Sequence, residues 1–292
     1  MKPNAIQTIV ITGGTAGIGL QSALALAKTG ARILISGRNI ERGEAAVAQV
    51  KAASHNPDVV FVQGDLSSMA GIDRLAADIL ARANTVDVLV NNAGYLGSEM
   101  CRNDDGVEMH FAVNVFAPWR LTRALLPALK RSQSARVLNV TGGDKPAPVD
   151  PGNLQGEKGF KGLMTYTHSK SVMESMSMGL AADLEPDGIM VNVVFPGRAS
   201  TDMTRSLSAK ALPGLMKLMY PLFKLFFRED GGKSAANAAR STIWAATHTE
   251  LEGVTASYFD TNSKLRSLHA TAYKPEVQRQ IRLTLDDIAR RN

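Results

Sequence analysis

The feature that most constrains this chain is an alternation between short apolar runs and longer stretches with helical periodicity. The runs are rich in Val and Ile, are of strand length, and occupy Thr8–Thr12, Arg32–Ser36, Val59–Gln63, Val86–Val90, Arg136–Thr141 and Ile189–Phe195. Between them, apolar residues recur at intervals of three and four positions, as in Leu20, Ala23, Leu24 and Ala27. Buried parallel strands joined by crossover helices give this pattern, so the sequence predicts an α/β fold with a three-layer, doubly wound parallel sheet.

The rest of the chain extends this fold without adding a second domain. We expect a last strand near Ser257–Asp260 at the sheet edge and a C-terminal helix over about 274–292. Hydrophobic residues make up 45% and charged residues 21%, which suits a globular protein with a sizeable core. With no internal repeat or linker in 292 residues, we expect one domain covering residues 1–292.

Charge and cysteine content restrict the class of protein. The formal net charge is +6, but Lys and Arg are scattered and aromatic residues make up only 5%, so no nucleic-acid partner is expected. Cys101 is the only cysteine, which excludes an intramolecular disulfide and fits a reducing compartment. The sequence shows no secretory signal and no uninterrupted apolar stretch of about 18 residues, and we expect a cytoplasmic location.

A proline interrupts the helical pattern between Gly106 and Lys130. Pro118 has no N–H to donate to the carbonyl of Asn114, and its ring crowds that carbonyl. The pattern predicts a kink, which either leaves this carbonyl available to another partner or serves packing alone.

The first expected strand leads directly into a glycine-rich segment, Thr12-Gly13-Gly14-Thr15-Ala16-Gly17-Ile18-Gly19, and then into a helix. Glycines let the backbone approach a diphosphate, and the helix N-terminus adds unpaired N–H groups. The spacing differs from the common dinucleotide fingerprint, and an ordinary strand-to-helix turn is the alternative. The position in the first βα unit favours a nucleotide site formed by Gly13, Thr15, Ala16, Gly17, Ile18 and Gly19.

The end of the second expected strand indicates which nucleotide binds. Sites for NAD place an Asp or Glu about 20 residues beyond the glycines. Here Ser36-Gly37-Arg38-Asn39 occupies that place. Arg38 can bind a 2′-phosphate through its guanidinium fork, Ser36 and Asn39 can donate to it, and Arg42 adds charge. The sequence therefore predicts NADP(H) as the cofactor.

Together with further motifs, these segments resemble the short-chain dehydrogenase/reductase family over nearly the whole chain. The motifs follow the family's order and are Asp65-Leu66, Asn91-Asn92-Ala93-Gly94, Asn114, Tyr166-x₃-Lys170 and Pro196-Gly197. The segment 153–158, followed by Tyr166-Thr167-His168-Ser169-Lys170, is similar to the retinol dehydrogenase-like branch, which is mostly NADP(H)-dependent. The resemblance implies a Rossmann-type sheet and an oxidoreductase.

The resemblance also implies cofactor contacts position by position. From the adenine to the nicotinamide end, these residues are Asp65, Leu66, Asn92, Ala93, Gly94, Pro196, Gly197 and Thr201. Asp65 is expected to hydrogen-bond the adenine amino group, with Leu66 beside the ring. Thr201 is expected to contact the nicotinamide end, next to the Pro196-Gly197 turn.

Tyr166 and Lys170 are four residues apart and therefore share one face of an expected helix. A tyrosine near its ordinary pKa of about 10 is a poor base, but a nearby ammonium, together with the charge of an oxidised nicotinamide, lowers that pKa. We expect Tyr166 to exchange a proton with an alcohol or carbonyl while hydride moves to or from the cofactor. The resemblance implies that Lys170 holds the nicotinamide ribose and that Asn114 completes a proton relay through a water.

A serine that the family has after the fifth strand is missing. The strand ends Val140-Thr141-Gly142, and Gly142 stands at the serine position, so one donor to the substrate oxygen is absent. Loss of such a donor typically costs about 2.7–4 kcal/mol. Thr141 is a candidate catalytic replacement if a one-residue bulge turns it toward the substrate, since alternation otherwise directs it to the opposite face. The substrate itself, a water or His168 are the other candidates.

Residues 199–232 are expected to form a helical lid over the substrate, as the segment after Pro196-Gly197 does in the family. Within it, Ala211–Phe227 is rich in Leu, Met and Phe, which favours a bulky apolar substrate: a lipid-like aldehyde or ketone, a polyene or a polycyclic compound. The same stretch could instead contact a membrane surface with its lysines snorkelling, pack in a dimer, or form ordinary core helices.

The sequence thus predicts an NADP(H)-dependent short-chain dehydrogenase/reductase that interconverts a carbonyl and an alcohol on a bulky apolar substrate, with reduction as the expected direction. Because of Gly142, the alternatives are an NADP(H)-binding sensor or scaffold, and a non-redox enzyme of the same fold. As is frequent in the family, we expect a homodimer or homotetramer. No metal is expected, because the five histidines show no metal-ligand spacing.

Overall fold

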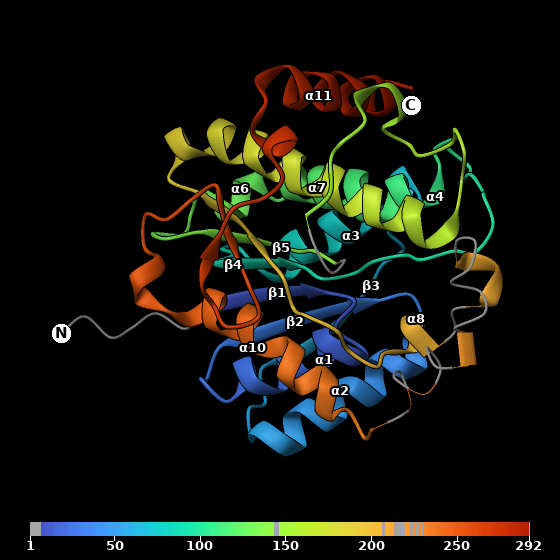
Figure 1. Ribbon diagram of the computed structural model, residues 1–292. Coiled ribbons are helices and arrows are strands. Elements are labelled where there is room, and N and C mark those ends of the chain that lie inside the picture. The colour runs from blue at the N-terminus through green and yellow to red at the C-terminus, as the bar shows by residue number, and fades with distance from the viewer. Residues whose placement is uncertain are drawn as a thin grey trace.

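Eight strands form one sheet in the order β3-β2-β1-β4-β5-β6-β7-β8 (Figure 1). Their bounds are β1 Thr8–Thr12, β2 Arg32–Gly37, β3 Val59–Gln63, β4 Val88–Asn91, β5 Arg136–Val140, β6 Met190–Val194, β7 Ser257–Phe259 and β8 Leu265–Arg266. The computed structural model describes residues 7–142, 146–205, 208–212, 220–221, 225, 228 and 230–291. In that part of the chain, β1 to β7 pair in parallel, which confirms the predicted doubly wound α/β sheet.

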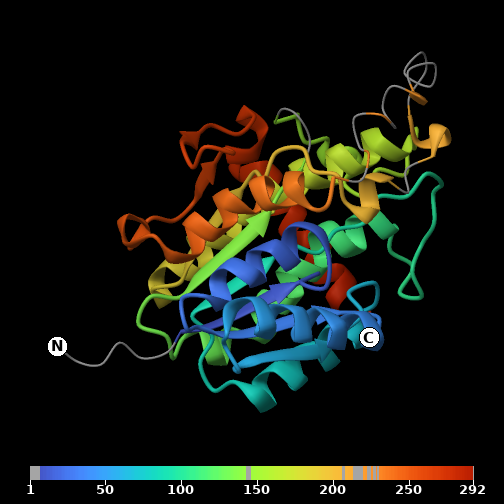
Figure 2. The same cartoon turned by 90° about the horizontal axis from the view of Figure 1, so that it is seen from below.

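Helices cover both faces of the sheet, as crossover connections between parallel strands require. One face carries α1 (Gly17–Ala27), α2 (Ile40–Ser54) and α10 (Lys233–Thr247), which lie side by side in Figure 2. The other carries α3 (Met69–Arg82), α5 (Ala117–Ala124) and α7 (Gly162–Leu184). The shorter α-helices and the C-terminal one are α4 (Met109–Phe111), α6 (Leu126–Leu129), α8 (Asp202–Arg205) and α11 (Pro275–Ala289). Single 3₁₀ turns occupy Pro151–Asn153, Glu185–Asp187, Ala209–Ala211, Thr249–Leu251 and Ala270–Tyr273.

Two apolar cores form because both faces of the sheet are covered. Neighbouring residues of a strand point to opposite faces, so Val10 packs on the α3 and α7 side while Ile9 and Ile11 pack on the α1 side. All three side chains are fully buried. This explains why the strands read as continuous Val- and Ile-rich runs instead of an apolar–polar alternation.

A chain of buried polar side chains crosses the α7 side of the sheet. Asn91 in β4 stands opposite Asn139 in β5 and donates to its Oδ1 at 2.8 Å. Asn139 in turn donates to Ser177 Oγ in α7, also at 2.8 Å. The contact orients α7 against the ends of these two strands, where the candidate site lies.

The strand expected near Ser257–Asp260 is β7, but it is not the sheet edge, and this prediction was wrong. β8 pairs antiparallel outside it, with Phe259 opposite Leu265. β8 has only two residues, and Leu265 is 65% exposed. Such a strand has no apolar pattern that a sequence could reveal.

The helix expected across Pro118 is interrupted, as predicted, and the interruption is a π-helical turn. Ala112–Phe116 form this turn, in which the N–H of Ala117 donates to the carbonyl of Ala112. Pro118 follows at the start of α5, where a missing N–H is tolerated. Asn114 therefore lies within the π-helical turn and is fully buried, and such turns are frequent at functional sites.

The C-terminal helix is present as expected and covers α7 from outside (Figure 1). Its buried residues, four or three apart, are Val277, Ile281, Leu285 and Ile288. Of the lid expected over about 199–232, the structure describes α8, the turn Ala209–Ala211 and a few further positions, so most of Ala211–Phe227 lies outside the described residues. No helix in the described part of the chain is long and apolar enough to cross a membrane.

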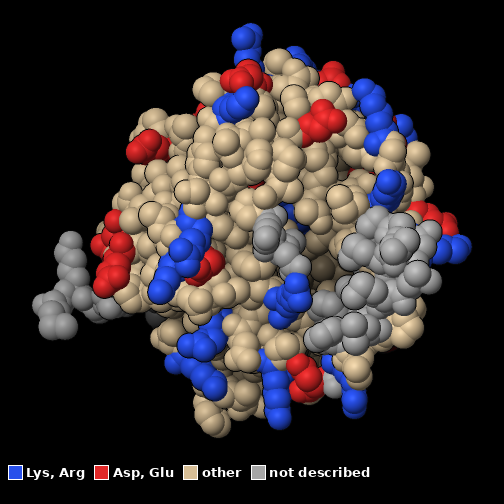
Figure 3. All heavy atoms as spheres, viewed as in Figure 1, with Lys and Arg blue, Asp and Glu red and all other residues tan. Residues whose placement is uncertain are grey.

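The surface charges are mixed on the face shown in Figure 3, where Lys and Arg side chains are interspersed with Asp and Glu. Ion pairs such as Lys130–Asp187 (2.8 Å) and Arg291–Asp287 (2.6 Å) join elements or turns at the surface. The net charge of +6 is therefore not gathered into one basic patch on this face.

Candidate active site

The candidate site lies where the carboxyl ends of β1, β4 and β5 meet. β1 lies between β2 and β4 in the sheet. The chain runs from β1 outward through β2 and β3 on one side, and then returns to place β4 on the other side of β1. In open α/β sheets, this reversal of strand order leaves a crevice that binds ligands. The segments after these strands supply most of the residues that the sequence assigned to cofactor and catalysis.

The glycine-rich segment forms a tight turn between β1 and α1. Gly13 (φ +63°) and Gly17 (φ +52°) have left-handed backbone conformations, and a β-carbon on Gly19 would lie 2.3 Å from the carbonyl oxygen of Gly13. α1 begins after Ala16 with no side-chain cap and no acidic residue in its first turn. The backbone N–H groups of this helix start are thus suited to an anion such as a diphosphate.

Asn92 holds the glycine-rich turn in shape. Its Nδ2 donates to the carbonyls of Thr12 (2.9 Å) and Gly13 (3.2 Å). The N–H groups of Asn92 and Ala93 both donate to Thr12 Oγ1, at 3.0 and 3.1 Å. The Asn92 side chain, expected to line the cofactor, therefore braces the turn from β4.

The end of β2 lies directly beside this turn. A β-carbon built on Gly37 would be only 2.8 Å from Cγ2 of Thr15. Arg38 is exposed and pairs with no carboxylate among the described residues, and Ser36 is buried. Asn39 caps α2, its Oδ1 accepting from the Arg42 N–H at 2.7 Å. The structure thus gathers the expected 2′-phosphate residues at one place and uses the Asn39 oxygen as a helix cap.

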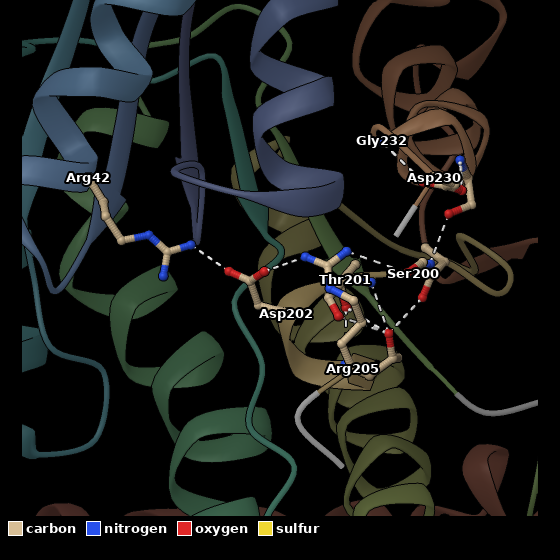
Figure 4. A network of polar contacts seen from close by, with 10 residues as sticks. Arg42, Ser200, Thr201, Asp202, Arg205, Asp230 and Gly232 are labelled. Carbon is tan, nitrogen blue, oxygen red and sulfur yellow. Dashed lines mark hydrogen bonds and ion pairs between the residues drawn. The ribbon is translucent and has the colours of Figure 1, made fainter. Parts of the chain in front are cut away.

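The segment Thr201–Arg205, which includes α8, contacts both the glycine-rich turn and α2. Thr201 contacts the glycine-rich turn, since its Cγ2 would stand 3.0 Å from a β-carbon on Gly17. Asp202 pairs with Arg42 of α2 at 2.5 Å and with Arg205 at 2.6 Å (Figure 4). These contacts hold the pKa of Asp202 below its usual value, the hydrogen bond from Arg42 being the largest cause. The carboxylate of Asp202 thus engages one of the two arginines expected near a 2′-phosphate.

The remaining expected cofactor residues also stand at this edge of the sheet. Asp65 follows β3 and accepts from the N–H of Ser67 at 2.9 Å, while Leu66 packs against the larger core. Pro196 and Gly197 follow β6, where Gly197 has φ +82° and a β-carbon would meet Thr261 at 2.7 Å. These residues thus follow strands that end at the same edge of the sheet as β1 and β4.

The segment after β4 meets α7 at Gly94, where Asn114 and Lys170 come together. A β-carbon on Gly94 would lie 3.4 Å from Asn114 Oδ1 and 3.6 Å from Lys170 Nζ. The Asn114 amide donates to the carbonyl of Tyr95 (3.0 Å) and to Ser169 Oγ (2.9 Å), and its Oδ1 accepts from the Tyr95 N–H (2.8 Å). Asn114 therefore ties the segment after β4 to α7, the helix that carries Tyr166 and Lys170.

Burial governs the protonation of the Tyr166–Lys170 pair. Tyr166 is 8% exposed, and burial raises its pKa to about 12. Lys170 Nζ donates to the carbonyl of Val140 at 3.0 Å, and burial lowers its pKa to about 8. In the protein alone, burial thus sets the pKa of Tyr166 above its ordinary value, and the lowering expected from Lys170 together with an oxidised nicotinamide stays a prediction. At neutral pH, Tyr166 carries its proton.

Gly142 lies against the hydroxyl of Tyr166: a β-carbon built on it would be 2.3 Å from that oxygen. The structure therefore brings together the expected serine position and the expected proton donor, with the tyrosine hydroxyl filling the space of a side chain. The bulge that was to turn Thr141 toward the substrate does not occur, since the Thr141 N–H continues the pairing by donating to the carbonyl of Val194. Its hydroxyl donates to Glu174 Oε1 at 2.5 Å, so Thr141 faces α7 and not the substrate.

A small apolar cluster stands beside the tyrosine end of α7. Leu96, Leu163 and Tyr220 pack against buried Ala211 and Leu212, separately from the two cores. The segment after β4 is held there by His110, whose Nε2 accepts from the Gly97 N–H at 3.0 Å and whose Nδ1 lies 2.7 Å from buried Glu108. This apolar cluster thus lies at the start of α7, the helix that carries Tyr166.

Sequence reasoning missed three residues here: Glu174, Tyr95 and Glu108. Glu174 is spaced four residues from Lys170, a signal that a search for acidic partners along α7 could have used. Tyr95 and Glu108 carry no such signal, because only the folded chain brings them near Asn114 and His110. His168, one candidate for the missing donor, accepts from the Asp150 N–H at 3.1 Å and so tethers a loop.

Comparisons with known proteins agree with this geometry. A family model described as short chain dehydrogenase matches residues 7–212. Retinol dehydrogenase 11 of Mus musculus is 31% identical over 251 residues, covering 86% of this chain and 76% of that protein. Polyprenol dehydrogenase of Homo sapiens is 30% identical over 286 residues, covering 96% of this chain and 84% of that protein. The similarity to a retinol dehydrogenase-like branch is thereby confirmed.

Solved structures show the same architecture. An uncharacterized protein from Mycobacterium paratuberculosis superposes with a TM-score of 0.75 at 21% identity, covering 97% of this chain and 93% of the other. The Pseudomonas aeruginosa RhlG/NADP active-site complex superposes with a TM-score of 0.64 at 26% identity, covering 93% of this chain and 100% of the other.

Proposed function

Because this chain belongs to the short-chain dehydrogenase family, whose members are oxidoreductases that use nicotinamide cofactors, we propose that it is an NADP(H)-dependent reductase of bulky apolar aldehydes or ketones. The observation that carries the proposal is that Asn114 and Lys170 meet beside Gly94, while Tyr166 lies on the same face of α7 as Lys170. This arrangement supports a proton donor and a cation next to the segment that follows β4.

The residues present fit a dinucleotide cofactor. The uncapped start of α1 and the left-handed Gly13 and Gly17 suit a diphosphate. The exposed Arg38, with Arg42 one helical turn on, favours a 2′-phosphate over a bare ribose hydroxyl. An NADP complex of a structural relative, RhlG of Pseudomonas aeruginosa, supports the same choice.

Tyr166 acts in this proposal as the proton donor. A bound reduced nicotinamide supplies the hydride that the carbonyl carbon accepts. The phenol, protonated at neutral pH because burial raises its pKa to about 12, gives its proton to the carbonyl oxygen and so completes the alcohol. Lys170 stabilises the resulting tyrosinate by its charge. In this proposal reduction begins from the protonated phenol, whereas oxidation of an alcohol would begin from the tyrosinate.

We assign the substrate to the isoprenoid alcohols and their aldehydes. Two relatives are named for the oxidation of such alcohols, retinol and polyprenol. The cluster of Leu96, Leu163, Ala211 and Leu212 at the start of α7 supports an apolar substrate. Chains of this kind would gain free energy by leaving water, at roughly 25 cal/mol per Å² of apolar area buried.

The test is to follow NADPH consumption with retinal, a short polyprenal and an unbranched aldehyde of similar length, for wild type and Tyr166→Phe. We expect turnover by wild type and its loss in Tyr166→Phe, with NADPH binding, measured by its fluorescence, retained in both. NADPH binding without turnover of any aldehyde or ketone would instead support the alternative of a binding protein. Equal turnover in Tyr166→Phe would refute the assignment of the proton donor.

A further inference from the structure

Four side chains of α7 meet the end of β5 in succession. Tyr166, Lys170 and Glu174 are each four residues apart and so share one face of the helix. Tyr166 lies against Gly142, and Lys170 donates to the carbonyl of Val140. Glu174 accepts from the hydroxyl of Thr141, and Ser177 accepts from Asn139. Of the three ionisable members, only Glu174 has no part in the mechanism above.

We propose that Glu174 is a positioning residue for the reaction, its carboxylate acting as the buried counter-charge of Lys170 while its bond to Thr141 holds the end of β5 beneath Tyr166. The inference rests on the proposed function for its effect on turnover. Its structural part, the coupling of Glu174 to Lys170, stands independently.

Burial is the first argument. Glu174 is 4% exposed and Lys170 is 3% exposed, and an isolated buried charge of either sign is costly. The carboxyl group raises the pKa of Lys170, against the lowering by burial, and Lys170 in turn lowers that of Glu174. Each group therefore helps the other to stay charged at the same depth in the protein.

The contact with Thr141 is the second argument. The Thr141 hydroxyl donates to Glu174 Oε1 at 2.5 Å and so ties the residue after β5 to α7. Thr141 immediately precedes Gly142, the residue against which the Tyr166 hydroxyl lies. A bond that fixes Thr141 to α7 therefore also fixes the distance between Gly142 and the proton donor.

The groups facing Glu174 come from three elements. α7 contributes Lys170, the residue after β5 is Thr141, and β7 contributes Tyr258. The pKa of Tyr258 is raised to about 12 by burial and, to a smaller extent, by Glu174 and Asp260. Of these three groups, Lys170 is the cation, and its charge lowers the pKa of Glu174. Removing the carboxylate should consequently be felt first at Lys170.

The decisive experiment titrates Lys170 by NMR in protein labelled at lysine Cε, with the resonance assigned through its absence in Lys170→Arg. We expect the Lys170 midpoint to fall by about one unit or more in Glu174→Gln, because the variant keeps a hydrogen-bond acceptor and loses the charge. Asp183→Asn, which removes an exposed carboxylate of the same helix that pairs with Arg282, is the matched control and should leave the midpoint unchanged. Equal midpoints in wild type and Glu174→Gln would overturn the proposal.

Turnover gives the second readout. The alkaline limb of kcat should move to lower pH in Glu174→Gln by the same shift as the Lys170 midpoint, with KM for NADPH less affected. Thr141→Val should lower kcat and Thr141→Ser should restore it, because serine retains the hydroxyl that reaches Glu174. A kcat unaltered in Thr141→Val would exclude the positional part. If wild type turns over no carbonyl substrate, the proposed function fails, whereas the titration still decides the coupling.

Discussion

The hydroxyl oxygen of Tyr166 occupies the space that a side chain on Gly142 would need, 2.3 Å from where its β-carbon would be. Loss of a side chain at this position and the inward placement of the tyrosine are thus complementary. The hydroxyl of Tyr166 thus occupies the place where the family's serine would stand.

Substituting Gly142 by Ala should therefore impair reduction. The added methyl group would displace the Tyr166 hydroxyl, and a displacement of about 1 Å at a reacting group can cost about 10²-fold in rate. Steady-state kcat of wild type, Gly142→Ala and Gly142→Ser measures this effect. A Gly142→Ala enzyme as fast as wild type would show that the close packing has no bearing on proton transfer.

Substituting Arg38 by Ala should weaken NADPH binding far more than NADH binding. A charge-assisted hydrogen bond contributes about 1.5–3 kcal/mol, so we expect a loss of roughly 10- to 100-fold for NADPH alone. Calorimetric titration with both nucleotides provides the comparison. Equal losses for the two would place the 2′-phosphate elsewhere.

Substituting Asp202 by Asn should strengthen NADPH binding slightly. Asp202 now pairs with Arg42, and both side chains are more than half exposed, so the pair contributes at most about 1 kcal/mol. Releasing Arg42 should raise the affinity for NADPH by up to about fivefold and leave NADH unaffected. Glu41→Gln, at the start of the same helix, controls for a general change of charge. A weaker affinity in Asp202→Asn would mean that α8 assists the phosphate.

Glu174→Gln should gain stability relative to wild type as the pH rises. Burial raises the pKa of Glu174 from 4.5 to about 7, so the folded state favours the protonated form. The resulting loss in the free energy of unfolding of wild type is absent below pH 4.5, the pKa of the carboxyl group in the unfolded chain. It grows between pH 4.5 and about 7 and then stays at about 3 kcal/mol. Thermal unfolding of both proteins near pH 5 and pH 8 tests the sign. A difference between the two proteins that is independent of pH would show that the buried carboxyl does not titrate in this range.

Alcohol oxidation should accelerate with pH up to about pH 8, above which Lys170 loses the charge that stabilises the tyrosinate. The reverse reaction needs the tyrosinate, whose fraction rises tenfold per pH unit below a pKa of about 12. Single-turnover rates from about pH 7 to pH 10 would show this slope below about pH 8. A plateau near neutral pH would mean that the bound cofactor lowers the tyrosine pKa by several units.

The sequence patterns predicted what depends on neighbours along the chain. Runs of Val and Ile gave the strands of the sheet to within two residues, and the spacing of Tyr166 and Lys170 gave their shared face of α7. Relations between distant segments were not accessible in the same way. Whether Thr141 turns toward the substrate or toward Glu174 depends on how β5 pairs with β6 and packs on α7. β8 forms only because β7 offers it an edge.

The buried hydrogen bonds from Asn91 through Asn139 to Ser177 disfavour a wrong register between β4 and β5. If β4 slipped against β5 by one residue, Asn91 would turn to the opposite face of the sheet, away from Asn139, and each unpaired group would cost about 1–3 kcal/mol. Apolar strands rich in Val and Ile tolerate such slips far better on packing grounds alone. These two asparagines thus favour the native register of β4 and β5, and with it the common level at which the segments after both strands begin.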